Sequence, residues 1–530
     1  MNPVLRSLLA SGLVMLLAAC VTPQATAGTM DVSILVDGQS LPLSIPAGST
    51  VQQALQQAQV ELGQLDLVEP PGYTVLTGGS QVIVTRRTER FEIEQIVIPF
   101  SRQTVSNEGL PAGETRLLQP GENGLEEITY RVLEEEGLEV SRQPAKRTVV
   151  QEPRAEILMV GTQAFHTPVA IQGRLALLSA GNAWVLQGDS TNRRPVVVSG
   201  DLDGQVFQLS PDGRWLLFSR SMQEGDQDFN GLWVVDLETP GADPVDLQAR
   251  NVVHFAEWSP EPSSTTVAYS TVEPRPSPPG WQANNDLVLV DVNQSGRAVN
   301  RRELLAANAG GQYGWWGTSF AWAPDGVHMA YARADSVGVI DLRQAELQDT
   351  HSVIPYETRA DWAWVPGIAW GYNSRTLYLV EHGQPLGLED DTASPVFDLI
   401  ALPSAGADPL SLVSRAGMFA YPAVSPATVL PTGEVAYQVA FLQAVSPLES
   451  EASSYRLTAM DRDGSNLRQL FPAAGEPGLS QEDLSAPVWS PTGEQLAVVY
   501  RGDLWIVNAG SGAAQPVTGD GQAAAVDWTP

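Results

Sequence analysis

One turn motif recurs along the last two thirds of this chain of 530 residues, and it constrains the fold more than any other feature. In its fullest form, Ser210-Pro211-Asp212-Gly213 follows an apolar residue and leads into an apolar strand at Trp215 to Phe218. Units about 40 to 65 residues apart, each with about four strands, are typical of a β-propeller. Related units begin at Trp258, Trp322, Trp370, Val424, Trp489 and Trp528.

A second recurring unit decides the number of blades. It is a short alternating strand, centred on Trp184, Trp233, Val288, Val339, Leu399, Thr458 and Trp505. The strand at Trp184 has no turn motif before it, and the motif at Trp528 has no strands after it. We therefore predict that residues 168–530 form seven blades, one of which is shared between the two ends of this segment. The segment around Val526 to Thr529 would add the inner strand to a blade whose outer strands come from about residues 169–199, which leaves no free sheet edge.

Residues 31–86 predict a small β-grasp module. Val32, Ile34 and Val36 form one apolar face of a strand, an Asp-Gly turn follows, and a second alternating strand comes after it. Thr50 is a candidate N-cap for a short helix, and residues 81–84 supply a returning strand. This order resembles the ubiquitin-like module (DUF348 type) of resuscitation-promoting-factor-like wall proteins.

Residues 88–164 are rich in strands, with glycines at turns and few positions for a deep core, so we expect an extended, flat module. Three motifs follow in order: Gln95 to Phe100 (QIVIPF), Leu117 to Gly124 (LLQPGENG) and Ile157 to Thr162 (ILMVGT). This order resembles a G5 domain. The resemblance implies contact with an envelope glycan that contains N-acetylglucosamine, and a rigid spacer is the alternative.

The N-terminal segment resembles the export signal of bacterial lipoproteins. Arg6 precedes an apolar stretch from Leu8 to Leu17, which is too short to span a bilayer, and the run Leu17-Ala18-Ala19-Cys20 follows. The resemblance implies that residues 1–19 are a signal peptide and that the only cysteine, Cys20, carries a lipid. Residues 20–30 would then be a flexible tether to the membrane. A secreted chain with a fortuitous cysteine is the alternative.

The formal net charge of -31 argues against nucleic acid and anionic lipid surfaces as partners. Lys146 is the only lysine, and so acidic a surface repels nucleic acid and anionic lipid headgroups. The expected partners are the membrane, through the lipid, and either a cell-wall glycan or envelope proteins. We expect an extracytoplasmic location.

No catalytic group stands out in the sequence. The blades resemble those of TolB-like and WD40-like propellers and of prolyl oligopeptidases, but the chain lacks the Gly-x-Ser-x-Gly elbow of a hydrolase. The five histidines are scattered, at His166, His254, His328, His351 and His382. We therefore expect a protein that is not an enzyme and has no cofactor.

One short segment could bind a metal. Asp226, Asp228 and Asn230, followed by Gly231, match the start of a calcium loop. The twelfth position is Leu237 instead of a bidentate glutamate, which favours an ordinary polar turn. Calcium is therefore the weaker interpretation.

Long connections are expected to gather on one face of the propeller. They are residues 224–230, 273–285, 382–395 and 442–454. Connections between blades add aromatic residues to the same face, where they could bind a ligand or wedge between blades. These candidate binding residues are Tyr313, Trp315, Trp316, Trp362, Trp364, Phe419 and Tyr421.

Together these features predict a mainly β protein: a β-grasp module, an extended G5 sheet and a seven-bladed propeller closed by its N- and C-terminal strands. The function they favour is a non-catalytic binding module for cell-wall glycan or peptidoglycan. A scaffold for protein partners in the envelope is the main alternative, and a propeller glycosidase or lyase is a third.

Overall fold

The computed structural model describes residues 28–162, 167–222, 227–430, 432–433 and 435–530. Cys20 and Asp226 lie outside these residues. The chain divides into two compact units, Met1–Gln103 with Gln119–Glu156, and Thr104–Leu118 with Ile157–Pro530. The division falls inside the segment that resembles a G5 domain.

The first unit begins with a mixed sheet around one short helix. Strands β1 (Thr29–Val36), β2 (Gln39–Pro46), β3 (Leu67–Glu69) and β4 (Gln81–Thr85) lie in the order β2-β1-β4-β3, and β1 runs parallel to β4. Helix α1 (Val51–Gln57) begins at Thr50, which forms a capping box with Gln53. Val51, Ala54 and Leu55 of this helix pack on Ile34 and other buried residues of the sheet. The order of strand, turn, strand, helix and strand is the one expected from the sequence.

The first unit continues into a long sheet with no helix on it. Strands β5 (Arg87–Ile98), β8 (Gly124–Glu135) and β9 (Leu138–Gln151) lie in the order β5-β8-β9. Cross-strand ion pairs line it, such as Arg90 Nε with Glu134 at 2.7 Å and Arg142 with Glu92 at 2.5 Å. Because most of its side chains stay in contact with solvent, this is the extended module that the sequence predicts.

The second unit includes a small sheet that packs on the propeller. Its strands β6 (Arg102–Asn107), β10 (Glu156–Gly161) and β7 (Thr115–Gln119) lie in the order β6-β10-β7. Arg193 of the propeller is buried where the small sheet meets the propeller. Its guanidinium lies 4.4 Å from the centre of the Trp184 ring and 3.6 Å from the Glu108 carboxylate. Glu108 also accepts a hydrogen bond from the amide of Gly519 at 3.1 Å. A cation packed between an aromatic face and a carboxylate ties the sheet to the propeller.

The propeller consists of seven sheets, six of which have four antiparallel strands. The first sheet consists of β13 (Leu202–Leu209), β14 (Trp215–Ser221), β15 (Asn230–Asp236) and β16 (Val245–Arg250). The second consists of β17 (Ala256–Trp258), β18 (Thr266–Tyr269), β21 (Leu287–Val292) and β22 (Ala298–Leu305). The third consists of β23 (Ser319–Trp322), β24 (His328–Ala332), β25 (Ser336–Asp341) and β26 (Glu346–Ser352). The fourth sheet consists of β27 (Ile368–Trp370), β28 (Thr376–His382), β29 (Phe397–Pro403) and β30 (Leu410–Val413). The fifth consists of β31 (Ala423–Val424), β34 (Gln438–Ala444), β35 (Tyr455–Asp461) and β36 (Arg468–Phe471). The sixth consists of β37 (Val488–Trp489), β38 (Gln495–Tyr500), β39 (Asp503–Asn508) and β40 (Ala514–Pro516). Two small hairpins, β19 (Val272–Pro274) with β20 (Trp281–Ala283) and β32 (Thr428–Val429) with β33 (Val435–Ala436), extend from this ring.

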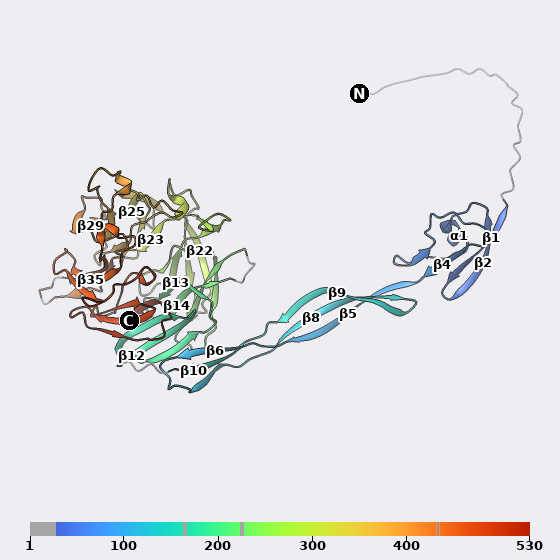
Figure 1. Ribbon diagram of the computed structural model, residues 1–530, viewed down its shortest axis with the longest axis horizontal. Helices are drawn as coiled ribbons and strands as arrows, with labels where there is room; N and C mark the ends of the chain where they lie inside the picture. The colour runs from blue at the N-terminus through green and yellow to red at the C-terminus, as the bar shows by residue number, and fades with distance from the viewer. Residues whose placement is uncertain (1–27, 163–166, 223–226, 431, 434) are drawn as a thin grey trace, which may run out of the picture. The chain divides into compact units, whose positions relative to one another are not determined.

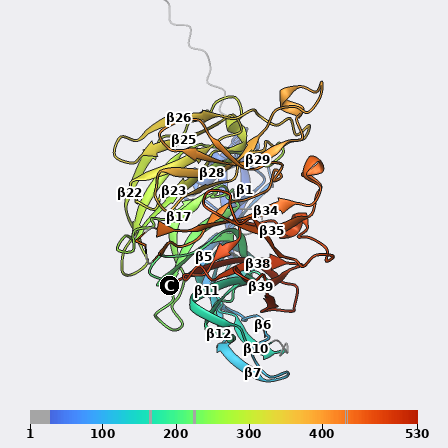
Figure 2. The ribbon, with the colours of Figure 1, turned by 90° about the vertical axis from the view of Figure 1, so that its left-hand side faces the viewer.

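The seventh sheet closes the ring as predicted. Strand β41 (Ala523–Thr529) pairs with β11 (Ala170–Ser179), and β11 pairs with β12 (Asn182–Val197). The C-terminus therefore lies beside strands that are more than 300 residues earlier in the chain, as Figures 1 and 2 show. This sheet has three strands instead of four.

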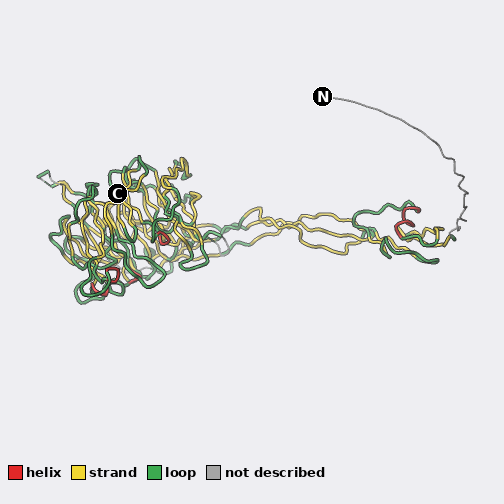
Figure 3. Tube along the Cα trace, turned by 90° about the horizontal axis from the view of Figure 1, so that it is seen from above, coloured by secondary structure: helices red, strands yellow, loops and turns green. Residues whose placement is uncertain are grey.

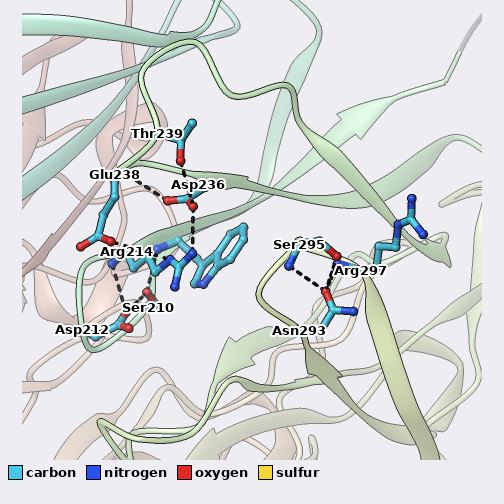
Figure 4. Close-up of polar contacts among 10 residues, drawn as sticks. Ser210, Asp212, Arg214, Asp236, Glu238, Thr239, Asn293, Ser295 and Arg297 are labelled. Carbon is cyan, nitrogen blue, oxygen red and sulfur yellow. Dashed lines mark hydrogen bonds and ion pairs between the residues drawn. The ribbon is translucent and has the colours of Figure 1, made fainter.

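The recurring turn motif is held by its own side chains. Ser210 Oγ donates to Asp212 at 2.5 Å and accepts from the Trp215 amide at 2.9 Å, and Asp212 accepts from the Arg214 amide at 3.0 Å. Figure 4 shows this turn, with Arg214 reaching Asp236 on the next strand at 3.0 Å. Gly213 has a φ of 68°, a conformation that favours glycine. The motif recurs because each blade needs the same tight connection between its first two strands.

Two tryptophans of the motif, Trp370 and Trp489, link neighbouring blades. The Trp370 indole donates to the Ala321 carbonyl at 3.1 Å, and the Trp489 indole donates to the Ala423 carbonyl at 3.1 Å. Each acceptor lies on the innermost strand of the preceding sheet. A large ring at this position therefore fills the space between two sheets and fixes their register through one hydrogen bond.

The antiparallel order of each sheet decides which connections share a face. The links between second and third strands and those between blades leave from one end of the sheets, and the turn motifs lie at the other end. Figure 3 shows loops at both ends of the propeller strands and short helical turns within the loops. Those turns are η1 (Gly314–Trp316), η2 (Asp391–Ala393), η3 (Pro447–Glu449) and η4 (Gln481–Asp483).

Within the part of the chain that the structure describes, no helix is long and apolar enough to cross a membrane.

Removal of residues 525–530 should destabilise the whole propeller. The deletion removes the buried Trp528, whose indole donates to the Gln172 carbonyl at 2.7 Å, and the Asp527 carboxylate, which accepts from the Leu209 amide at 2.6 Å. Loss of a buried tryptophan alone costs about 3 to 5 kcal/mol. We expect a large fall in melting temperature by calorimetry, whereas deletion of the exposed Pro530 alone serves as the control. An unchanged melting curve in the longer deletion would contradict this closure.

Candidate ligand site on the loop face of the propeller

Connections from three places in the sequence meet around a cavity of about 310 Å³. Tyr313 and Trp316 come from the link between β22 and β23, residues 355–363 from the link between β26 and β27, and Thr392 from the link between β28 and β29. We call this cavity the aromatic cleft. Its lining consists of Tyr313, Trp316, Pro355, Tyr356, Glu357, Thr358, Arg359, Ala360, Trp362, Ala363 and Thr392.

Hydrogen bonds fix the shape of the aromatic cleft. The Glu357 amide donates to the Thr392 carbonyl at 2.8 Å, and this bond joins two of the connections. Thr358 Oγ1 donates to the Trp362 carbonyl at 2.5 Å, which closes a tight loop around Arg359. The Tyr356 hydroxyl donates to Glu451 at 3.2 Å, and burial together with that carboxylate raises the pKa of Tyr356. The rings are therefore held in place before any ligand arrives.

The aromatic cleft also carries charge. Glu357 and Arg359 both line it, and their side chains approach to 3.9 Å at the exposed rim. Aromatic faces beside a few polar groups are what sugar rings and extended peptides use for binding.

The structure separates the predicted aromatic residues into groups. Tyr313, Trp316 and Trp362 line the aromatic cleft, while Trp315 is half-buried on η1 and is not part of its lining. Trp364 is 2% exposed within the core and donates to the Met418 carbonyl at 3.0 Å. The indole of Trp364 is therefore a packing group, and the hypothesis of ligand contact passes to the partly buried rings that line the aromatic cleft.

Phe419 and Tyr421 continue a row of rings that begins at Trp362. The Trp362 and Phe419 rings stack with centres 6.4 Å apart, and the Phe419 and Tyr421 rings stack at 6.1 Å. Tyr421 lines the central channel of the propeller, where burial raises its pKa. The row thus connects the aromatic cleft with the channel through packed side chains.

The central channel encloses about 610 Å³ and is lined by Glu257, an acidic residue that the sequence analysis did not single out. Burial, together with the nearby Asp527 charge, raises the pKa of Glu257 to about 7, and burial raises the pKa of Asp527 to about 6. Glu257 accepts from the Trp322 amide at 3.4 Å. His254 lines the same channel, and burial lowers its pKa to about 4.

A signal for these acidic groups exists in the repeat itself. Glu257 and Asp527 both stand directly before the tryptophan of the turn motif, and Gln208 occupies the same position in the sheet between them. The other sheets carry Ala321, Ala369, Ala423 and Val488 there. The aligned repeats therefore indicate which three blades carry a polar residue at this position of the innermost strand.

Two of the candidate calcium ligands take part in the hairpin, and the third, Asp226, lies outside the described residues. Asp228 accepts from Asn251 Nδ2 at 2.7 Å. Asn230 is fully buried, and its oxygen accepts from the Val252 amide at 2.8 Å. Among the residues placed by the structure, no three His, Cys, Asp or Glu side chains form a group suited to a metal ion. Calcium binding here stays a prediction.

Family models match three segments of the chain. Residues 89–163 match the G5 domain, and residues 32–72 match the G5-linked-Ubiquitin-like domain. Residues 451–528 match the dipeptidyl peptidase IV (DPP IV) N-terminal region. The first two matches confirm the resemblances found in the sequence.

Comparison with curated proteins finds resuscitation-promoting factor RpfB of Mycolicibacterium smegmatis. It is 25% identical over 155 residues, which are 28% of this chain and 43% of the relative. The match therefore spans less than half of the relative's length.

Solved propellers are similar at low identity. A TolB structure from Agrobacterium tumefaciens is 17% identical over 62% of this chain and 98% of its own, with a TM-score of 0.35. The β-propeller domain of the Trilobed protease from Pyrococcus furiosus is 12% identical over 67% of this chain and 97% of its own, with a TM-score of 0.39. The chain thus combines a ubiquitin-like module and a G5 domain with a seven-bladed propeller, whose seven sheets are established by its own strand pairing.

The raised pKa of Glu257 predicts that Glu257→Gln stabilises the propeller above neutral pH. A carboxyl with a pKa of about 7 when folded and 4.5 when unfolded supports the fold below about pH 4.5 and loses this support as the pH rises through 7. The variant and the wild type should therefore be equally stable near pH 4, and the variant should be more stable by on the order of 2 kcal/mol near pH 8.

Chemical unfolding at several pH values measures this difference. The variant must be compared with the wild type at each pH, because burial lowers the pKa of His254 to about 4 and the charge of His254 therefore changes the stability of both proteins at acidic pH. Glu261→Gln, at an exposed turn residue, is the matched control and should follow the wild type. A constant difference between Glu257→Gln and the wild type at all pH values would contradict the prediction.

Proposed function

We propose that this protein is a non-catalytic, envelope-anchored binding protein that contacts cell-wall glycan through its G5 domain and through the aromatic cleft. The observation that carries the proposal is the aromatic cleft itself, where Tyr313, Trp316, Tyr356 and Trp362 meet beside Glu357 and Arg359. Aromatic faces bind the apolar faces of sugar rings, and nearby charged and hydroxyl groups bind their polar substituents.

The G5 domain supports the same assignment. Its β5 strand exposes Phe91, Ile93 and Val97 on one side of the long sheet, and Phe91 is 61% exposed. Apolar groups in such a row on a sheet without a covering layer indicate a contact surface. The likeness to a resuscitation-promoting factor, whose aligned part is 155 residues, agrees with a place at the cell wall.

The lipid on Cys20 would supply the anchor. With the signal peptide removed, residues 20–30 would tether the β-grasp module to the membrane on its outer side. Several acyl chains, at about 0.8 kcal/mol for each buried methylene, hold a protein on a bilayer essentially permanently.

A scaffold for envelope proteins is the second candidate. It is favoured by the long connections on the loop face, such as the β19 and β20 hairpin. Retention from an envelope extract separates the two candidates, because prior muramidase treatment should release a glycan-bound protein and leave a protein-bound one in place.

Alanine at three partly buried rings that line the aromatic cleft should abolish retention on purified wall glycan without unfolding the protein. We expect the triple variant Tyr313→Ala, Trp316→Ala and Trp362→Ala to lose at least tenfold in affinity, since stacked rings contribute about 1 kcal/mol or more each. Trp364→Ala is the contrasting control, because a cavity in the core should lower the melting temperature by several degrees. Full retention by a folded triple variant would remove the aromatic cleft from the proposal.

Replacement of Cys20 by alanine should abolish incorporation of a fatty-acid analogue and release the protein from the membrane fraction. The thiol is the only one in the chain, so no second site can take the lipid through sulfur. Ser33→Ala, in the β-grasp module, is a control that should keep the label. Persistent labelling of Cys20→Ala would contradict the anchor.

A further inference from the structure

Another cavity lies on the loop face, at the end of the β27 to β30 sheet, and encloses about 820 Å³. Its walls come from the ends of β26, β28 and β29, from the link between β28 and β29, and from the link that follows β30. We call it the polar pocket, because Glu381, Asp398 and Arg415 bring charge to it. Ile354 lines the polar pocket and the next residue, Pro355, lines the aromatic cleft, so one segment separates the two cavities.

Two carboxylates stand side by side in the polar pocket. Glu381 and Asp398 are directly opposite each other on β28 and β29, so their side chains leave the same face of the sheet. Like charges in such a cross-strand pair destabilise a sheet. One oxygen of Glu381 lies 2.6 Å from His351 Nε2, and one oxygen of Asp398 accepts from the Arg415 amide at 2.6 Å. The second oxygen of each carboxylate forms no hydrogen bond within the described part of the chain, so both are available to a cation from outside.

Arg415 brings the opposite charge into the same pocket. It is exposed, and its guanidinium forms no ion pair or hydrogen bond with any residue that the structure describes. Its backbone amide holds it beside Asp398, so the distance between the guanidinium and that carboxylate is limited by the reach of one side chain. A guanidinium binds a carboxylate through two parallel hydrogen bonds. The polar pocket thus offers a free site for an anion next to a free site for a cation.

The neighbouring His382 does not belong to this charged set. It is 1% exposed, and its two ring nitrogens lie 2.9 and 2.7 Å from the carbonyl oxygens of Ile354 and Ser394. The ring also stacks on Phe397, with ring centres 4.9 Å apart. His382 is therefore part of the wall, whereas the Glu381 side chain stays 27% exposed.

We propose that the polar pocket binds a free amino-acid end, which carries an ammonium and a carboxylate on the same carbon atom. The ammonium lies between Glu381 and Asp398, and the carboxylate binds the Arg415 guanidinium. An ammonium donates three hydrogen bonds, which suits a pair of carboxylates, and it offsets the repulsion between them. Such ends occur on free amino acids and on the unsubstituted ends of diamino acids in peptides. This site is separate from the proposed function, because it needs no glycan.

Two isomers of acetyl-lysine test the assignment on the full chain. Nε-acetyl-lysine keeps the ammonium and the carboxylate on one carbon, whereas Nα-acetyl-lysine separates them by the length of its side chain. We expect the first isomer to bind, measured by calorimetry or NMR titration, and the second to bind about tenfold more weakly. Equal affinity of the two isomers, or no binding of Nε-acetyl-lysine up to about 10 mM, would overturn the proposal.

Conservative variants test the three charged groups. Glu381→Gln, Asp398→Asn and Arg415→Gln should each bind Nε-acetyl-lysine about tenfold more weakly, because each removes a charge-assisted contact. The two carboxylate variants should melt no lower than the wild type, since they also remove the repulsion between Glu381 and Asp398. Arg343→Gln is the matched control: Arg343 is also exposed and its amide bonds Asp341 at 2.8 Å, but it does not line the polar pocket.

The control should bind as the wild type does. Wild-type affinity in all three pocket variants would overturn the site. Weaker binding only in variants that also melt lower would indicate a structural role for these residues, which would overturn it as well.

A second probe distinguishes the source of the amino-acid end. It is a tripeptide that contains diaminopimelate with its distal end free. Tighter binding of the tripeptide than of Nε-acetyl-lysine would support the site with a peptide as its ligand, and equal binding would support it with a free amino acid. Retention on wall glycan is measured separately, so a failure of the proposed function and a failure of this site give different results.

Discussion

The antiparallel pairing of β11 with β41 is the constraint on which the propeller depends. It joins residues 170–179 to residues 523–529, so the ring of seven sheets has no free edge between its first and last strands. Trp528 and Asp527 add side-chain bonds to Gln172 and Leu209 on two different sheets. Each sheet of the closed ring packs between two neighbours. The ring therefore fixes the positions of the strand ends from which the connections on the loop face extend.

The aromatic cleft is a product of that closure. Its rings come from the links on either side of the β23 to β26 sheet, and the sheets hold those links close enough for Glu357 to bond Thr392. A second layer supports the rings, since Tyr356, Trp364 and Phe397 enclose His382. The stacked rings of Trp362, Phe419 and Tyr421 pack between the cleft and the channel.

Much of this fold was predictable because its signals are local. The turn at Ser210 to Gly213, the Asp37-Gly38 hairpin and the Thr50 cap each depend on residues a few positions apart. The candidate site was predictable only in part. The sequence pointed to Tyr313, Trp316 and Trp362, but it also included the buried Trp364 and omitted Tyr356 and Arg359, because burial of a ring in a loop depends on which blade lies against it.

The sequence by itself determined the modules, the number of blades and the closing strand, since repeated motifs and alternating residues specify strands and turns wherever they occur. Tertiary structure decided which aromatic rings line the cleft, which carboxyls are buried near one another and which carbonyls meet His382. Glu257 and Asp527 are 270 positions apart, and Ile354 and Ser394 approach the same ring from two connections. Such encounters depend on long-range packing, which places groups within a few ångströms regardless of their distance along the chain.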